Sequence, residues 1–229
     1  MPIDLPDLEW SETSLVSEER ITKGVPNRAP DGDLESRILL GGPICRPLEQ
    51  ILPAGDPALV ALTAEQDSVA YTMTDLAVTF EGAEEERIEK VWVQVKLTAT
   101  QTSQPPIVWS MTPDKVSSPV EMFASADIKA DLKVFTAGVT TSRKTTGEAT
   151  FLEALNLLRS DPVWEFSRSG AHEIRGAHRL VLVVRSPAGI AVEGRLSITA
   201  SIRRKHWNII PYRVLLAGGL DTSIFPIRS

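Results

Sequence analysis

The sequence predicts a mainly β fold, a two-layer antiparallel β-sandwich of about eight strands with one or two short helices. Three observations predict it. Apolar and polar residues alternate in several short segments, as strands with one buried face require. These segments follow one another without helices between them, which disfavours an α/β fold. Glycines and prolines, 14 and 16 in number, separate the segments as turn residues do.

The composition is that of an ordinary globular chain. It has 229 residues, of which 42% are hydrophobic and 24% charged. A single cysteine, Cys45, excludes an intramolecular disulfide framework and a cysteine-clustered zinc site, and it fits a reducing compartment. No apolar run approaches the 18 residues of a transmembrane helix, and residues 1–10 lack the features of a secretory signal. We therefore expect a cytoplasmic protein.

Residues 1–36 are expected to form an acidic, irregular N-terminal arm that precedes a single sandwich domain at 37–229. The arm contains four prolines, many carboxylates and few apolar residues, so it cannot form a core of its own. Trp10 is the side chain expected to anchor the arm. We expect a chain shortened to 37–229 to stay folded but to change its oligomeric state or its partner binding.

The predicted strands follow a period of two along the chain. The alternating segments are 76–80, 91–99, 128–134 and 196–202. Shorter strands are expected from residue 37, at 107–109, at 164–166 and at 209–216. Residues 180–184 form a continuous apolar run instead, so this strand is expected to be covered on both faces.

Two short helices are predicted. The first begins at Pro57, with Asp56 as its N-cap. The second is expected over 151–159, because Thr150 and Glu153 have the spacing of a capping box.

The net charge of −6 is unevenly distributed along the chain. Residues 1–90 carry 19 acidic and 7 basic side chains, whereas residues 91–229 carry 11 acidic and 17 basic ones. The two parts could attract each other within one fold. Alternatively, the basic part could bind phosphate or acidic lipid and the acidic part could mask it. Both interpretations stay open at this point.

No catalytic motif of a known class is present. The chain lacks G-x-G-x-x-G, a P-loop, a G-x-S-x-G elbow and H-E-x-x-H. A hydrolase that uses Cys45 with one of the three histidines is an alternative, since Arg46 could lower the pKa of the thiol. The surrounding Pro-rich loop matches no nucleophile signature, so we expect a protein that is not an enzyme.

Metal and cofactor sites are not expected. His172 and His178 are six residues apart but lack a third ligand nearby. The alternating carboxylates at 31–35 lack the spacing and the distal Glu of a calcium loop, so a solvated acidic loop is the better interpretation.

The densest basic run is 203–207, where three cations and a histidine precede Trp207. Cations next to an aromatic ring are typical of single-stranded nucleic-acid binding. Because the chain is acidic overall and has only two tyrosines, nucleic acid is an unlikely partner and a solvated strand end is favoured. The residues expected to make interactions are Trp10, Arg203, Arg204 and Lys205.

These observations together predict a non-enzymatic cytosolic binding or assembly module that acts through protein contacts or self-association, with no small-molecule substrate. The first alternative is a membrane-active, pore-forming β protein that inserts the hairpin at 128–150. The alternation in this hairpin fades after Val139, short of the roughly ten-residue spans that a lipid-crossing hairpin needs.

Overall fold

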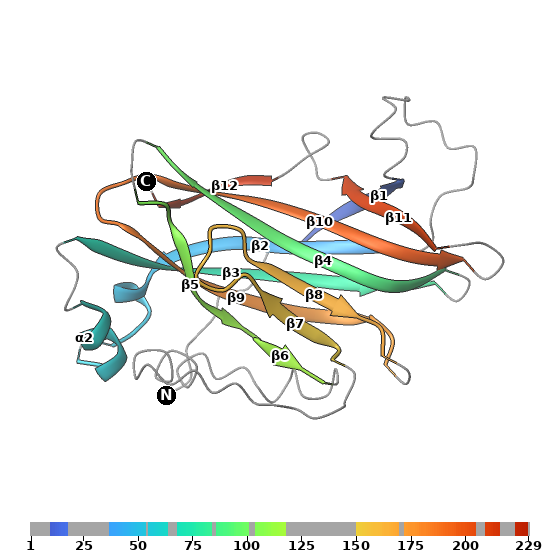
Figure 1. Ribbon diagram of the computed structural model, residues 1–229, viewed down its shortest axis with the longest axis horizontal. Coiled ribbons are helices and arrows are strands. Elements are labelled where there is room, and N and C mark those ends of the chain that lie inside the picture. The colour runs from blue at the N-terminus through green and yellow to red at the C-terminus, as the bar shows by residue number, and fades with distance from the viewer. Residues whose placement is uncertain are drawn as a thin grey trace.

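The computed structural model shows a mainly β, sandwich-like chain with antiparallel strands in two sheets (Figure 1). It describes residues 10–17, 37–53, 55–63, 68–83, 86–100, 104–117, 150–169, 172–204, 209–215 and 223–228. The predicted fold class is confirmed. The described residues form twelve strands where the sequence indicated about eight, and several of the additional strands are short.

The first sheet has the strand order β5-β9-β3-β2. Its strands are β2 (Arg37–Pro47), β3 (Val69–Glu81), β5 (Ile107–Thr112) and β9 (Gly176–Pro187). β3 and β9 are the central pair, and they stay in register from Val69 opposite Pro187 to Phe80 opposite Gly176.

The second sheet has the order β11-β10-β4-β8-β7-β6. Its strands are β4 (Glu86–Ala99), β6 (Lys115–Val116), β7 (Leu152–Leu155), β8 (Val163–Ser167), β10 (Val192–Arg204) and β11 (Ile209–Leu215). A further strand, β12 (Ser223–Arg228), lies on the same edge of β10 as β11 does. β11 pairs with the C-terminal half of β10 and β12 with its N-terminal half.

The strand β1 (Trp10–Ser17) joins the two sheets along one side. Its residues 10–13 pair with β2, and its residues 14–17 pair with β11. The sequence prediction of an irregular arm was therefore wrong for these eight residues. The segment is rich in serine and threonine and has no strand periodicity of its own, so its pairing depends on edges that other parts of the chain provide. The division into an arm and a domain stays a prediction.

Backbone hydrogen bonds also join the sheets on the other side. The loop after β7 reaches β5 of the first sheet, where the N–H groups of Val108 and Leu158 donate to the carbonyls of Arg159 and Val108, both at 2.9 Å. The same loop reaches β4 of the second sheet, where the Leu97 N–H donates to the Ser160 carbonyl at 2.7 Å. The sandwich is thus linked along both of its long sides.

The main core lies between the sheets, and a smaller core lies outside the first sheet. Alternate side chains of β9 divide between them: Leu180 and Leu182 enter the main core, and Val181 and Val183 enter the smaller one. The smaller core is closed by a 3₁₀ turn, η1 (Leu48–Gln50), and by the helix α2 (Pro57–Thr63), which Figure 1 shows at one end of the sheet. The prediction that 180–184 is covered on both faces is confirmed.

The two helix predictions had different outcomes. α2 begins at Pro57, and the carbonyl of Asp56 accepts a hydrogen bond from the Val60 N–H at 2.9 Å, so the first helix is confirmed. The second, over 151–159, was wrong. Its first half is β7, which pairs with both β6 and β8. Asn156 and Leu158 have positive φ angles, which a right-handed helix does not contain. The two neighbouring strands outweigh a local capping pattern that contributes about 1 kcal/mol.

Candidate functional site

Four exposed cations form two pairs on the solvent-facing side of β4 and β10, and we call this surface the basic face. The two strands run side by side for most of their length (Figure 1). Their register places Arg87 directly opposite Arg203, and Lys96 directly opposite Arg195. All four residues are exposed, while their neighbours Ile88, Val95, Leu97, Leu196 and Ile202 point into the main core.

The two like-charged pairs are not neutralised within the described part of the chain. None of these four cations makes a hydrogen bond or an ion pair there. Like charges directly opposite each other on a sheet destabilise it by some tenths of a kcal/mol, a cost that a bound anion would offset. Eight residues separate Arg195 from Arg203, so the pairs lie about 27 Å apart at a strand rise of roughly 3.4 Å per residue.

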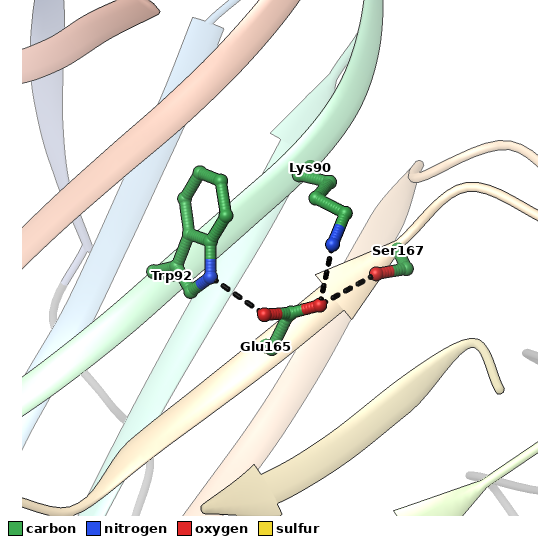
Figure 2. Close-up of polar contacts among 4 residues, drawn as sticks. All are labelled: Lys90, Trp92, Glu165 and Ser167. Atoms are coloured by element: carbon green, nitrogen blue, oxygen red, sulfur yellow. Dashed lines mark hydrogen bonds and ion pairs between the residues drawn. The ribbon is translucent and has the colours of Figure 1, made fainter.

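A polar cluster centred on Glu165 of β8 lies beside β4, at a level along that strand between the two pairs. Figure 2 shows its four residues. One carboxylate oxygen accepts hydrogen bonds from the Lys90 ammonium at 2.7 Å and from the Ser167 hydroxyl at 3.1 Å. The other oxygen accepts the indole N–H of Trp92 at 2.7 Å. Burial acts to raise the pKa of Glu165, but these hydrogen bonds and the charge of Lys90 outweigh it and hold the pKa below its usual value.

The Glu165 cluster makes the middle of the basic face polar but nearly neutral. Lys90 lies over the Trp92 ring, with 5.7 Å from its ammonium to the ring centroid, and Glu165 balances its charge. The residues opposite on β10 are Thr199 and Ser197, which face Trp92 and Gln94. The positive charge is therefore concentrated at the two ends of the face.

The structure places the four predicted interaction residues in different ways. Arg203 lies on the basic face. Arg204 is the last residue of β10, and the structure describes its backbone only. Lys205 lies outside the described residues. Trp10 is the first residue of β1 and belongs to the part that pairs with the first sheet, so the structure does not bring it to β10.

Sequence reasoning missed Arg87, Lys96 and Arg195 as members of this surface. Lys96 and Arg195 are single cations within alternating strands, and Arg87 follows three glutamates, so none of them has a local signal of its own. Only the pairing of β4 with β10 and its register align them with Arg203. A strand pairing could have been inferred from the two alternating patterns, but not the bulge that shifts the register near Ser201.

Cys45 lies on β2, half buried against the main core. Its thiol is 3.3 Å from the hydroxyl of Thr74 on the neighbouring β3. Burial raises the pKa of the Cys45 thiol, and the hydrogen bond to Thr74 offsets this only in part. A thiolate nucleophile requires a lowered pKa, so the arrangement does not favour the proposed cysteine hydrolase.

His178 points into the main core rather than toward a ligand. Its ring lies 5.4, 5.7 and 5.2 Å from those of Phe80, Phe151 and Phe166, and its Nε2 is 3.0 Å from the Arg175 carbonyl oxygen. Burial lowers the pKa of His178 to about 4, so the imidazole is neutral at physiological pH.

The remaining sequence candidates give no site in the described chain. His172 forms an isolated bridge with Ser169. Among the described residues, no three His, Cys, Asp or Glu side chains are placed to hold a metal ion. His206, the carboxylates at 31–35 and residues 118–149, which include most of the proposed membrane hairpin, lie outside the described residues.

Comparisons with known proteins do not assign the chain to a family. No protein-family model matches it, and no curated protein matches it. Within the described residues, no helix is both long enough and apolar enough to cross a membrane.

Proposed function

We propose that this protein is a non-enzymatic cytoplasmic binding or assembly module whose basic face binds an acidic segment of a protein partner. The observation that carries the proposal is the pairing of Arg87 with Arg203 and of Lys96 with Arg195 on one exposed surface. A carboxylate-bearing segment would relieve the repulsion within each pair.

The spacing of charge on this surface favours an extended polypeptide. An extended chain rises about 3.3 Å per residue, so roughly eight residues would span the 27 Å between the pairs. Acidic residues near both ends of such a segment would meet the cations. Its middle would lie over Trp92, Thr199 and Ser197, which offer an aromatic surface and hydroxyl groups.

A nucleic-acid strand fits the same surface less well. Phosphates repeat at every nucleotide, so some would fall between the two pairs, next to the carboxylate of Glu165. Glu193 adds an exposed carboxylate two residues from Arg195. The alternation of cations and carboxylates therefore supports a partner with separated acidic groups.

Binding of a labelled poly-glutamate peptide, measured by fluorescence anisotropy at low and high salt, tests the proposal. We expect salt-sensitive binding that weakens about threefold to tenfold in Arg87→Ser/Arg203→Ser and in Lys96→Ser/Arg195→Ser, because each exposed ion pair contributes up to about 1 kcal/mol. Arg37→Ser/Arg46→Ser is the matched control. It removes the same two positive charges from β2 in the other sheet and should leave binding unchanged.

Two results would contradict this proposal. One is equal loss of peptide binding in the control and in the double variants, which would show that only net charge matters. The other is tighter binding of single-stranded DNA than of the peptide, with the DNA affinity lost in the same double variants.

A further inference from the structure

A small hollow lies beside Arg87, at the end of the basic face that carries the Arg87–Arg203 pair. It is found where the chain leaves β3 and enters β4, next to the segment that follows β8. Three of its lining side chains are arginines, Arg87, Arg168 and Arg175. Its cavity volume is about 10 Å³, which is room for one oxygen atom. The hollow can therefore receive a single atom of a group that is bound mostly outside it.

The carboxylates around the hollow have partners of their own. Glu173 pairs with Arg175, with 3.0 Å between Oε2 and Nε, and Glu89 pairs with Arg168, with 3.1 Å between Oε1 and Nη1. Glu86 is buried and has an interaction elsewhere, in which Arg87 takes no part. These acidic groups therefore leave the charge of Arg87 uncompensated.

Arg168 has a donor that the described part of the chain does not use. Its Nη1 serves Glu89, whereas its Nε–H is buried and has no hydrogen-bond partner among the described residues. A buried donor without an acceptor is unfavourable, and buried polar groups in proteins are normally paired. An unpaired donor on a side chain that lines the hollow points to a ligand oxygen as the acceptor.

The two ends of the basic face differ in net charge. Neither Arg87 nor Arg203 makes an ion pair in the described part of the chain, so this end carries two positive charges. At the other end, Glu193 lies two residues from Arg195, so Lys96, Arg195 and Glu193 together leave one positive charge. A phosphoryl group has nearly two negative charges and three acceptor oxygens, so it matches the first end, whereas a carboxylate matches the second.

We propose that the Arg87 end of the basic face binds a phosphorylated serine or threonine of the partner's acidic segment. The guanidinium groups of Arg87 and Arg203 donate to two of the phosphoryl oxygens, because their planar forks fit phosphate. The third oxygen enters the hollow beside Arg168. This inference rests on the proposed binding role of the basic face, and it adds the chemistry that one end of that face recognises.

Fluorescence anisotropy with two matched peptides tests the inference. Each labelled peptide is about ten residues long and has glutamates at one end. The opposite end, about eight residues away, carries either phosphoserine or glutamate, and both orientations of the sequence are used. We expect the phosphoserine peptide to bind about tenfold more tightly than the glutamate peptide, as one further charge-assisted contact would give.

Lysine substitutions separate the geometry of the guanidinium group from its charge. Arg87→Lys/Arg203→Lys keeps both charges but loses the planar forks, so the tenfold preference for phosphoserine should fall to about threefold or less. Affinity for the glutamate peptide should change little. Arg168→Lys removes the unpaired Nε–H and should lower the preference in part. Arg195→Lys is the matched control, since it makes the same change at the other end of the face and should leave the preference intact.

The inference is overturned if the phosphoserine peptide binds no more tightly than the glutamate peptide, or if Arg87→Lys/Arg203→Lys keeps the full preference. Phosphatidylcholine vesicles that contain phosphatidic acid test a lipid phosphate as the ligand instead. Tighter binding to these vesicles than to the phosphoserine peptide, lost in Arg87→Ser/Arg203→Ser, would also overturn it.

The glutamate peptide distinguishes failure of this inference from failure of the proposed function. Salt-sensitive binding of the glutamate peptide without any gain from phosphoserine would leave the basic face standing and remove only the phosphate site. If neither peptide binds, both proposals are wrong.

Discussion

His178 shows how a single residue can link the core of this protein to pH. The imidazole lies among three phenylalanine rings, where a positive charge would be poorly solvated. Its Nε2 contact with the Arg175 carbonyl does not compensate for this, and the pKa is lowered to about 4. The unfolded chain, by contrast, would take up a proton on this residue near pH 6.5.

We expect the free energy of unfolding to fall as pH is lowered through the window from about 6.5 to about 4. Within it the unfolded state binds a proton that the folded state does not, and the full loss from His178 is about 3 kcal/mol. Urea unfolding at a series of pH values measures this. His178→Gln, which can still donate to the Arg175 carbonyl, should flatten the dependence.

His172→Gln is the matched control, because this histidine is only partly buried and should leave the acid sensitivity as it is. An equally steep loss of stability in His178→Gln would show that other groups cause it.

At the scale of elements, β12 depends on a glycine in β10. Gly194 is a buried position of β10 and lies opposite Phe225 of β12. A Cβ at this position would lie 2.7 Å from Cε2 of Phe225 and 3.0 Å from Cδ1 of Ile227. Both side chains belong to the main core, so the bare glycine leaves room for β12 to pack there.

Gly194→Ala should lower the free energy of unfolding by about 1 to 3 kcal/mol, the range for overpacked core positions. Because the clash is with the Phe225 ring, Gly194→Ala combined with Phe225→Leu should lose less than the sum of the two single changes. Denaturant unfolding of the unsubstituted chain, the two single variants and the double variant measures this coupling. If the two losses in free energy of unfolding are strictly additive, the Phe225 ring is not the cause of the destabilisation by Gly194→Ala.

The sequence predicted the elements whose signal is local. The alternating patterns of β4 and β10, the double burial of β9 and the proline-initiated α2 all follow from side-chain spacing and capping within one segment. β7 and β1 could not be predicted in this way, because each is a strand only through the backbone groups of its neighbours. The basic face was predicted only at Arg203, since its other members depend on register.

For the whole molecule, the position of β1 changes what removal of the N-terminal arm should do. A chain that begins at residue 37 lacks eight paired residues and exposes the edges of both β2 and β11. We expect it to unfold at a lower urea concentration than the full chain and to aggregate, which light scattering would detect. A chain that lacks only residues 1–9 keeps β1 and should match the full chain.

An unchanged urea midpoint in the chain that starts at residue 37 would mean that β1 contributes little to the sandwich. This outcome would agree with the prediction from composition, in which residues 37–229 fold without the N-terminal arm.

The ladder between β1 and β11 also bears on how the protein is made. Ser14 pairs with Leu215, so these two paired residues are 201 residues apart along the chain. The ribosome makes the chain from its N-terminus, at roughly 5–20 residues per second. β1 therefore leaves the ribosome long before the partner of its second half has been translated, and it can meet β2 of its own chain first. Until β11 emerges, half of β1 stays unpaired, and nascent chains on neighbouring ribosomes of one messenger would present the same open strand to each other.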